Sequence, residues 1–310
     1  MRPVASKANE NLSRLPTERP NSTAENLDLK SSLEIVRIIN SQDAEVAAAV
    51  EAALYQIARG IDVIAEALKK GGRLFYVGAG TSGRIAALDA SECPPTFNTH
   101  RRMVQFVIAG GTKALHTATE ASEDSRALGH REIAKKKPGK KDVVVGVAAS
   151  GRTPFTVAAI EYARHHGAKT IAVTCNPNSP LGKAADFAIV AQVGPEVIAG
   201  SSRMKAGTAE KMILNMLSTG AMTRLGYVYG NLMINLHVKN HKLRERAFTI
   251  LEQLAAISRK AAKEALRASG DAVPVALVML QANVSRAQAT RALKSTKGNV
   301  RQAIAAARSL

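Results

Sequence analysis

The chain has 310 residues, of which 46% are hydrophobic, so it can bury a core in one or two domains, and its formal net charge is +18 at pH 7. The charge suits a small anionic substrate, but with aromatic residues at 4%, no Trp and no recognised RNA- or DNA-binding motif, the composition does not predict specific binding to nucleic acid. No apolar run is long enough to span a bilayer, no secretion leader is expected, and two cysteines cannot form a disulfide framework, so we expect a cytoplasmic protein with no membrane partner.

The first fifty residues combine a polar arm with the start of a helix. Up to about Leu29 the chain is polar and interrupted by prolines, which predicts an arm. Helical periodicity follows over Ser31–Lys70, with a break expected at Asn40–Asp43 because "SQD" offers an N-cap. We therefore predict a first segment, residues 1–50, of arm and helix.

Five short apolar runs then alternate with helical segments. They lack the polar alternation of a half-exposed strand, which is typical of a parallel sheet buried on both faces. The alternation predicts an α/β fold with a doubly wound, five-stranded parallel sheet flanked by helices. The predicted strands are Leu74–Val77, Met103–Ala109, Asp142–Ala148, Thr170–Thr174 and Phe187–Ala191.

From Ser202 to the end the pattern is helical. A long helix is expected first, then a second helical segment over Asn231–Ile257, then two or three short helices with a loop around Ser269–Val273. This predicts a small all-helical C-terminal domain at residues 226–310, after a sheet domain at residues 51–225.

Three loops share glycine and hydroxyl residues. The first follows Leu74–Val77 and spells G-x-G-x-x-G, the second follows Asp142–Ala148, and the third precedes the long helix. Glycine lets the backbone approach an anion closely, and hydroxyls and helix N-termini supply donors, so we predict a cradle for a phosphate monoester at the carboxyl ends of the strands. The candidate contacts are Gly80, Thr81, Ser82, Arg84, Ser150, Gly151, Thr153, Ser201, Ser202, Arg203 and Lys205.

A dinucleotide site and simple turns are the two alternatives to a phosphate cradle in these loops. A dinucleotide site would need an acidic residue at the end of the second strand to hold the ribose, but that strand ends in "VIAGG". For any single loop, glycines that only cap a strand or form a turn are an equal alternative, whereas three such loops together favour phosphate binding.

Carboxylates near these loops are candidates for proton transfer. Glu92 lies in "DASECPP", where we expect the prolines to end the helix and hold the carboxylate at the strand ends. Glu120, Glu123 and Asp124 cluster in "TATEASEDSR", for which a solvated helix end is the alternative. Glu92 and one member of the cluster form a candidate general acid/base pair.

We predict neither a metal nor a cofactor. His237 and His241 stand four residues apart but lack the glutamate of a zinc-binding H-E-x-x-H motif. Cys93 has no histidine near it in sequence, so a packed thiol explains it better than a nucleophile.

Taken together, these stretches resemble the N-acetylmuramic acid 6-phosphate etherases, a branch of the sugar isomerase (SIS) domain proteins. The resemblance covers nearly the whole chain, and its most specific blocks are "SECPP" and "SSRMKAGTA", with further matches at "GAGTSGR", "EASEDS" and "VAASGRTPF". The chain departs from the family pattern at Asn235, where Asp is usual, at Glu210, where Gln is usual, and at Ala199, where Thr is frequent. None of these departures removes an acid/base candidate, although Asn235 weakens any carboxylate role for that segment.

The resemblance implies a SIS-type fold, with residues 51–225 as the sugar-phosphate-binding domain, and a homodimer. It implies cleavage of the D-lactyl ether of N-acetylmuramic acid 6-phosphate to N-acetylglucosamine 6-phosphate and D-lactate, in cell-wall sugar recycling. It also carries the two active-site glutamates over to Glu92 and Glu123. A non-catalytic SIS-domain regulator that binds a sugar phosphate and a partner protein, and a sugar-phosphate isomerase, stay open as alternatives.

Overall fold

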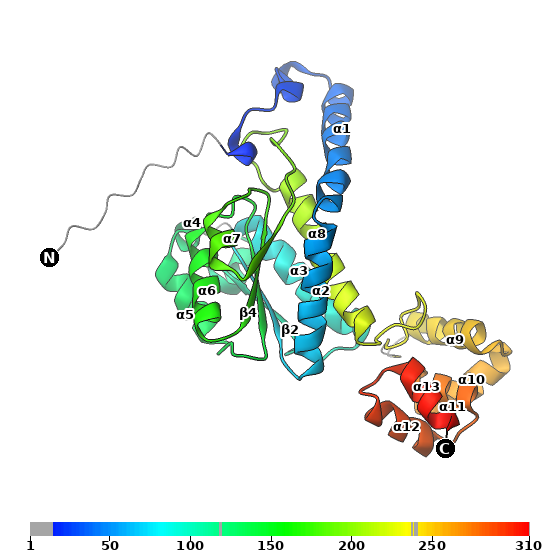
Figure 1. Cartoon of the computed structure of the whole chain (residues 1–310). Helices are drawn as coiled ribbons and strands as arrows, with labels where there is room; N and C mark the ends of the chain where they lie inside the picture. Colours follow the sequence, from blue (N-terminus) through cyan, green and yellow to red (C-terminus); the bar gives the residue numbers. More distant parts are fainter. Residues whose placement is uncertain (1–14, 118–119, 237, 239–240, 310) are drawn as a thin grey trace. The chain divides into compact units, whose positions relative to one another are not determined.

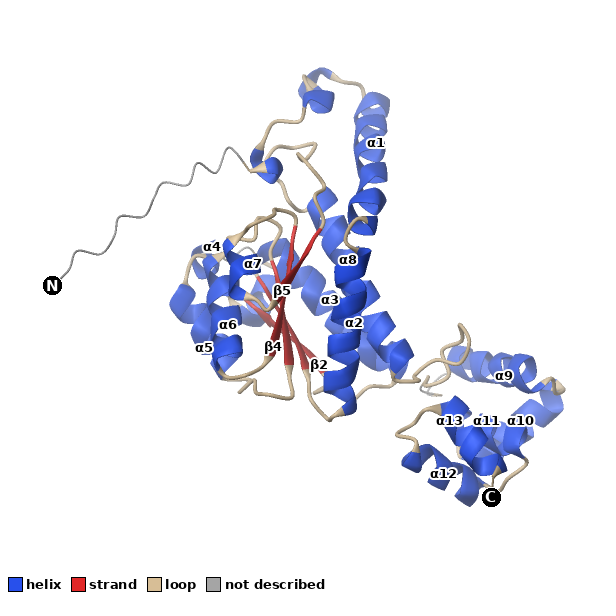
Figure 2. Cartoon of the chain, viewed as in Figure 1, coloured by secondary structure: helices blue, strands red, loops and turns tan. Residues whose placement is uncertain are grey.

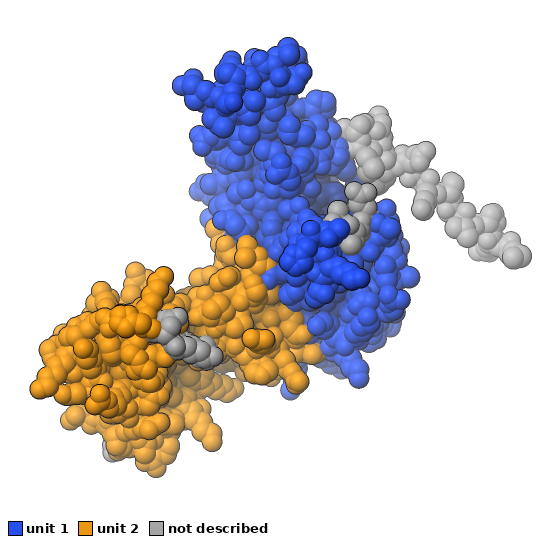
Figure 3. All heavy atoms as spheres, turned by 180° about the vertical axis from the view of Figure 1, so that it is seen from behind, with its two compact units in different colours: residues 1–57, 75–87, 106–214 blue, residues 58–74, 88–105, 215–310 orange. Residues whose placement is uncertain are grey.

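The structure is a computed structural model and describes residues 15–117, 120–236, 238 and 241–309. The chain divides into two compact units (Figure 3). Residues 1–57, 75–87 and 106–214 form the first unit, and residues 58–74, 88–105 and 215–310 form the second. No helix in the described part of the chain is long and apolar enough to cross a membrane.

A five-stranded parallel sheet forms the core of the first unit, with helices on both faces (Figure 2). The strands are β1 (Leu74–Gly78), β2 (Val104–Ile108), β3 (Val143–Val147), β4 (Lys169–Thr174) and β5 (Phe187–Val190). Their order is β2-β1-β3-β4-β5, and every residue of β1 and β3 is buried, as expected for strands covered on both faces. The predicted α/β class and the five predicted strands are confirmed.

One face of the sheet is covered by three helices of the first unit (Figure 1). These are α5 (Arg126–Ala134), α6 (Pro154–His165) and α7 (Pro180–Ala184). Phe155 and Ile160 of α6 belong to the same buried cluster as Val144 of β3. Gly146 allows this close packing, since a Cβ at that position would lie 2.7 Å from Ile160 Cγ1.

Helix α1 runs unbroken over Ser32–Glu51, so the break predicted at Asn40–Asp43 is wrong. The helix begins with a capping box between Ser31 and Glu34. Inside it, the Ser41 hydroxyl donates to the Ile38 carbonyl at 2.8 Å, so the residue that resembled an N-cap bonds back into its own helix. Helix α2 (Leu54–Lys69) follows.

Helix α3 (Gly80–Phe97) contains Pro94 and Pro95, so the prediction that these prolines end the helix beside Glu92 is also wrong. The fixed φ of proline suits a helix, and in the last turn the missing N–H groups remove few helix bonds. The Asn98 N–H donates to the Pro94 carbonyl at 2.9 Å and closes that turn. Glu92 is therefore an exposed helix residue rather than a carboxylate held at the strand ends.

The described part of the predicted arm packs on the first unit instead of extending from it. The Thr17 side chain is buried, and its hydroxyl accepts a hydrogen bond from Asn176 Nδ2 at 3.2 Å. Asn21 Nδ2 donates to Gln42 Oε1 at 2.7 Å and to the Pro195 carbonyl at 3.3 Å. The arm is thus tied to segments far away in the sequence, beyond β4 and β5.

The rest of the chain is helical, as predicted, but with different boundaries. The helices are α8 (Lys205–Arg224), α9 (His241–Ala255), α10 (Arg259–Ser269), α11 (Val273–Ala282), α12 (Arg286–Ser295) and α13 (Val300–Arg308). Helices α9 to α13 share a hydrophobic cluster that includes Phe248, Leu277 and Ile304.

Two details of this C-terminal region differ from the prediction. The segment expected to be helical over Asn231–Ile257 is helical only from His241, and residues 231–236 and 238 form turns and a short bridge between Tyr229 and Leu232. Four helices, not two or three, follow α9. Two of these helices, α10 and α11, end where Gly270 and Asn283 adopt left-handed C-cap conformations.

Candidate functional site

The three predicted loops belong to the first unit. The first two follow adjacent strands, and the first and third contact the same residue of α8. β1 and β3 are adjacent strands, so the loops after Gly78 and Val147 leave the sheet at the same edge. Thr81 and Ser202 both lie against Gly207 of α8, since a Cβ built there would be 3.5 Å from Thr81 Cγ2 and 3.5 Å from the Ser202 carbonyl oxygen. The structure therefore places the first and third loops together beside the start of α8.

The three glycines of the G-x-G-x-x-G loop have different roles. A Cβ on Gly78 would lie 2.9 Å from the Gly83 nitrogen, and a Cβ on Gly83 would lie 2.6 Å from Ile108 Cγ1. These two glycines are needed for the close approach of α3 to β1 and β2. Gly80 differs because its φ is 51° and the space beside it faces Glu123. Packing thus explains two of the glycines, and Gly80 alone lines the candidate site.

Glu123 lies at the first loop, at the end of the short helix α4 (Glu120–Glu123). A Cβ built on Gly80 would be 2.9 Å from Glu123 Oε1, so the carboxylate stands at the first residue of α3. The side chain is half-buried. The free N–H groups of a helix N-terminus favour a negative charge, which makes this a position where both a carboxylate and a bound anion are stabilised.

The second loop is a tight turn held by side chains at the end of β4 and just after it. Gly151 has a φ of 65°, and a Cβ at this position would lie 2.4 Å from Ser179 Oγ. The Thr174 hydroxyl and Asn176 Nδ2 both donate to the Ala149 carbonyl, at 3.2 Å and 3.1 Å. These contacts define the conformation of the loop, in which the side chains of Ser150 and Thr153 are half-buried. The Ser150 hydroxyl accepts the backbone N–H of Arg152 at 3.2 Å, and Thr153 is the N-cap residue of α6.

The third loop leads into α8, whose N-terminus is already capped by a buried carboxylate. The two oxygens of Glu196 accept the backbone N–H groups of Lys205 at 2.9 Å and Ala206 at 3.0 Å. Burial raises the pKa of Glu196, and these two hydrogen bonds act in the opposite direction. The first amides of α8 are thus occupied, so an anion in this region depends on the loop and its hydroxyls.

Lys205, one of the predicted phosphate contacts, points into the protein. Its side chain is 1% exposed, and Nζ donates to Gln42 Oε1 at 2.8 Å and lies 3.6 Å from Glu45 Oε2. Both partners are on α1, so the ammonium group holds α1 against the start of α8.

Ser82 contacts a second buried carboxylate. Its hydroxyl donates to Glu210 Oε1 at 2.8 Å, which joins the start of α3 to α8. Glu210 is 1% exposed, and burial raises the pKa of its carboxyl to about 8, with the hydrogen bond from Ser82 acting in the opposite direction and the nearby Glu196 adding to the rise. Burial thus favours the neutral form of a carboxyl group that is hydrogen-bonded to a predicted phosphate contact.

The remaining predicted contacts are arginines and hydroxyl residues of the first and third loops. The half-buried Arg84 donates through Nε to the Ala114 carbonyl at 3.0 Å. Ser201 and Ser202 are half-buried, and Arg203 is exposed.

Glu92 lies on the same helix as Gly80 of the glycine loop, and on its exposed surface. It lies twelve residues after Gly80 on the continuous helix α3, which corresponds to roughly 18 Å along the helix axis. A hexose 6-phosphate is much shorter than this distance. The pairing of Glu92 with the phosphate cradle stays a prediction.

The two other residues considered for chemistry do not add to the site. Cys93 is buried, and burial raises the pKa of its thiol to about 12, with a smaller contribution from Asp89, as expected for a packed thiol. His237 lies outside the described residues, so its pairing with His241 is not described.

Sequence reasoning missed the roles of Glu196 and Glu210. Glu210 carried a signal, because it is four residues from Ala206 and from Leu214, both buried, and so shares the apolar face of α8. Glu196 caps a helix from nine residues upstream, outside the spacing of any local capping motif.

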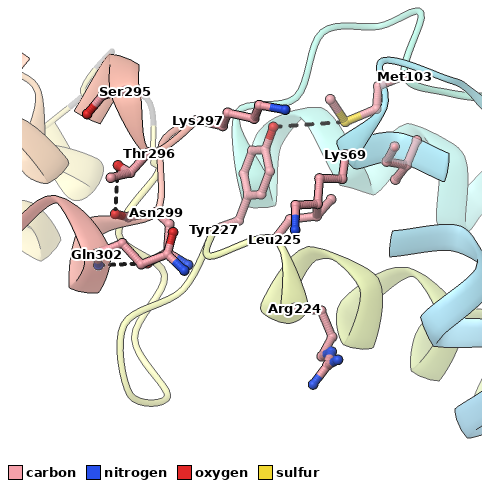
Figure 4. Close-up of a pocket in the computed structure, with 11 residues that line it drawn as sticks. Lys69, Met103, Arg224, Leu225, Tyr227, Ser295, Thr296, Lys297, Asn299 and Gln302 are labelled. Carbon is pink, nitrogen blue, oxygen red and sulfur yellow. Dashed lines mark hydrogen bonds between the residues drawn. The ribbon is translucent and has the colours of Figure 1, made fainter. Parts of the chain in front are cut away.

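A separate cavity of about 330 Å³ lies in the second unit (Figure 4). Lys69, Arg224 and Lys297 line it, together with Tyr227, whose hydroxyl donates to Met103 Sδ at 4.0 Å. No residue predicted for the site lines this cavity.

Comparison with known families identifies SIS-type sequence in the sheet region. Residues 56–164 match the "Glucokinase regulatory protein N-terminal SIS domain" family and residues 135–219 match the "SIS domain" family. Residues 275–307, which cover α11 to α13, match the "HYPK UBA domain" family.

Similar proteins cover most of the chain. A protein of Symbiobacterium thermophilum named "N-acetylmuramic acid 6-phosphate etherase" is 57% identical over 88% of this chain and 91% of its own length. The "N-acetylmuramic acid 6-phosphate etherase 1" of Bacillus licheniformis is 45% identical over 96% of this chain and 97% of its own length. A protein of Pasteurella multocida with the first of these names is 48% identical over 94% of this chain and 96% of its own length.

Proposed function

This chain belongs to the N-acetylmuramic acid 6-phosphate etherase family, and we propose that it cleaves the D-lactyl ether of N-acetylmuramic acid 6-phosphate with water, giving N-acetylglucosamine 6-phosphate and D-lactate. The observation that carries the proposal is a carboxylate, Glu123, at the N-terminus of a helix whose first turn is rich in glycine and hydroxyls. This arrangement combines an anion site with a proton-transfer group.

Cleavage of the lactyl ether by elimination requires two acid/base groups. An alkyl ether resists direct hydrolysis, but in the open-chain sugar carbon 2 is adjacent to the aldehyde and its proton is acidic. Removing that proton allows the ether oxygen on carbon 3 to leave as lactate, and water then adds to the unsaturated product. One group must accept the carbon 2 proton and another must protonate the departing oxygen. We assign the first role to Glu123 and the second to Glu92.

The phosphate group orients the sugar from its far end. The N-terminus of α3, with Gly80, Thr81 and Ser82, supplies N–H groups and hydroxyls. Ser150, Gly151 and Thr153 of the second loop and Ser201 and Ser202 of the third supply further donors, with Arg84 and Arg203 contributing charge. Lys205 does not bind the phosphate directly, because its ammonium group interacts with Gln42 and Glu45; it contributes only long-range electrostatic attraction to the anion. Binding energy from the phosphate positions carbon 2 against the carboxylate.

We assign Glu92 to the site of a second copy of the chain, in a homodimer. The roughly 18 Å of helix between Gly80 and Glu92 is too long for one sugar phosphate to bridge within a chain. Exposed apolar side chains on and before α1 supply a surface for the second copy: Leu29 is 78% exposed, Leu33 56% and Val36 55%. A symmetric dimer would exchange one glutamate between its two sites.

Charge on this surface should separate the subunits. Leu33→Glu places a carboxylate on the apolar face of α1, and we expect the dimer dissociation constant to rise by about tenfold or more. Analytical ultracentrifugation over a range of protein concentrations measures it. Lys30→Glu, which changes a polar neighbour, is the control. A variant that stays as dimeric as the unmodified protein would exclude this face as the interface.

The reaction belongs in the cytoplasm, in the recycling of cell-wall amino sugars. The two cysteines, Cys93 and Cys175, are buried free thiols, which suits a reducing compartment. We also propose that the chain has three segments, an arm and helix at residues 1–50, a sugar-phosphate-binding domain at 51–225 and a helical domain at 226–310. The hydrophobic cluster that α9 to α13 share supports the last of these segments.

An assay of free D-lactate tests the proposed function. The purified protein is incubated with N-acetylmuramic acid 6-phosphate, and we expect stoichiometric release of D-lactate and N-acetylglucosamine 6-phosphate. The unphosphorylated sugar is the control and should react far more slowly, because it lacks the group that the loops bind. A non-catalytic regulator would bind the phosphosugar without releasing lactate, and an isomerase would convert a sugar phosphate without losing a group from carbon 3.

A further inference from the structure

Glu210 is a buried carboxyl group for which the proposed reaction gives no role. It is 1% exposed in the interior of the first unit, and its only described hydrogen bond is the one from Ser82 to Oε1 at 2.8 Å. Among the described residues, Oε2 has no hydrogen-bond partner although it is buried. A buried carboxylate with one donor is strongly disfavoured relative to the neutral acid.

The charged groups around Glu210 do not compensate a negative charge on it. Glu196, in the segment after β5, adds a second carboxyl group. Cys175, in the segment after β4, adds a thiol. Burial, and after it the charge of Glu210, raises the pKa of this thiol well above its usual range. Lys205, at the start of α8, interacts with Glu196, Gln42 and Glu45. Ser82, on α3, is neutral. The pKa of Glu210, about 8, is consistent with this environment.

The direction of the bond between Ser82 and Glu210 depends on this proton. When Glu210 is ionised it can only accept, so the Ser82 hydroxyl must point its hydrogen at Glu210. When Glu210 is protonated it can donate to Ser82 Oγ, and the Ser82 hydrogen is then free to turn toward an anion. The distance of 2.8 Å between the two oxygens suits either direction.

We infer that Glu210 is a proton-linked positioning residue, which must carry a proton for Ser82 to donate to the phosphate group of the substrate. The inference rests on the proposed function, because it takes Ser82 as a phosphate contact. Binding of a phosphate dianion to the ionised form requires one proton to pass from water to the Glu210 carboxylate. Without that proton, the site loses a donor and presents a negative charge behind Ser82.

The sign of the pH dependence follows from this linkage. The bound state holds the Glu210 proton more tightly than the free state, so affinity is constant below the free-state pKa and falls as pH rises through it. Above a pKa of about 8, the dissociation constant should rise about tenfold per pH unit. The second pKa of a phosphate monoester is about 6, so the ligand itself stays a dianion over this range.

The test measures binding of N-acetylglucosamine 6-phosphate by calorimetry between pH 7 and 9.5. We expect the unmodified protein to bind about fivefold more weakly at pH 9 than at pH 8, and to take up about one proton per site at pH 9, as shown by the dependence of the heat on buffer ionisation. In Glu210→Gln the amide donates to Ser82 permanently, so the affinity should change less than about twofold over the same range. Glu161→Gln, an exposed carboxylate on α6, is the control and should keep the unmodified pH profile.

The outcomes separate the inference from the function on which it rests. If N-acetylglucosamine 6-phosphate binds with the same affinity at every pH and without proton uptake, the inference is wrong and the proposed function stands. If Glu210→Gln keeps the full decline above pH 8, another group is responsible and the inference is again wrong. The proton-uptake measurement needs no variant, so it decides the question even if Glu210→Gln does not fold. Absence of binding at pH 7 would overturn the proposed function and the inference together.

Discussion

Replacing Glu123 by Gln should lower kcat for D-lactate release by roughly 10²–10⁴-fold, because the carboxylate at the first turn of α3 is replaced by a group that cannot accept a proton. Binding of N-acetylglucosamine 6-phosphate should change little, since glutamine has the same shape and the phosphate contacts are retained. The variant should also lose exchange of the carbon 2 hydrogen of the sugar with solvent deuterium, which reports the proton abstraction itself.

Asp124→Asn provides a matched control for this variant. Asp124 is the next residue in the chain and is exposed, so its amide should leave lactate release close to the unmodified rate. Near-normal release in Glu123→Gln, or carbon 2 exchange at the unmodified rate, would remove Glu123 from the first step. Equal losses in both variants would indicate a general effect of charge at the end of α4.

Replacing Glu92 by Gln should also lower kcat for lactate release by roughly 10²–10⁴-fold, but its effect on exchange of the carbon 2 hydrogen should differ from that of Glu123→Gln. If Glu92 protonates the departing oxygen, the carbon 2 proton is still removed and returned in the variant, so exchange with deuterium persists while lactate stays bound to the sugar. Measuring exchange and release on the same samples distinguishes the two glutamates. Loss of exchange in Glu92→Gln, with exchange kept in Glu123→Gln, would reverse their roles.

Mixing the two inactive variants tests where Glu92 acts. In a hybrid dimer of one Glu92→Gln and one Glu123→Gln subunit, a site that takes Glu92 from the second copy recovers both carboxylates, while the other site has neither. Random exchange of subunits makes half of the dimers hybrid, so the mixture should recover about a quarter of the unmodified activity. Each variant mixed with itself is the control. No recovery after demonstrated subunit exchange would mean that both glutamates act within one chain.

The sheet could be predicted from the sequence because its signal is local. Runs such as "LFYV" and "VVVGV" are apolar at every position, and only a strand covered on both faces hides all of them. The helix boundaries were less predictable because local signals compete with packing. Ser41 and Pro94 have the chemistry of helix ends, yet both lie inside helices. Ser41 bonds back to the Ile38 carbonyl of its own helix, and Pro94 lies in the last turn of α3, where its missing N–H removes few helix bonds.

The candidate site was predictable in its loops and not in what supports them. The glycine and hydroxyl pattern located Gly80, Ser82 and Ser150, and the acidic cluster located Glu123. The resemblance supplied Glu92, but no pattern in the sequence could show that twelve helical residues separate it from the loop at Gly80. Lys205 carries the charge of a phosphate contact, and only its burial against α1 shows that the charge is used elsewhere.

By itself, the sequence determined the class of the fold, the five strands, the three loops and the identity of the residues able to move protons, because each depends on periodicity or on residue types close together in the chain. The tertiary structure alone decided which carboxyl groups are buried and what they contact. Ser82 and Glu210 are 128 positions apart, and Lys205 and Gln42 are 163 apart. The pKa of a carboxyl group is set by water and by the charges around it, and both are fixed only when such distant segments pack together.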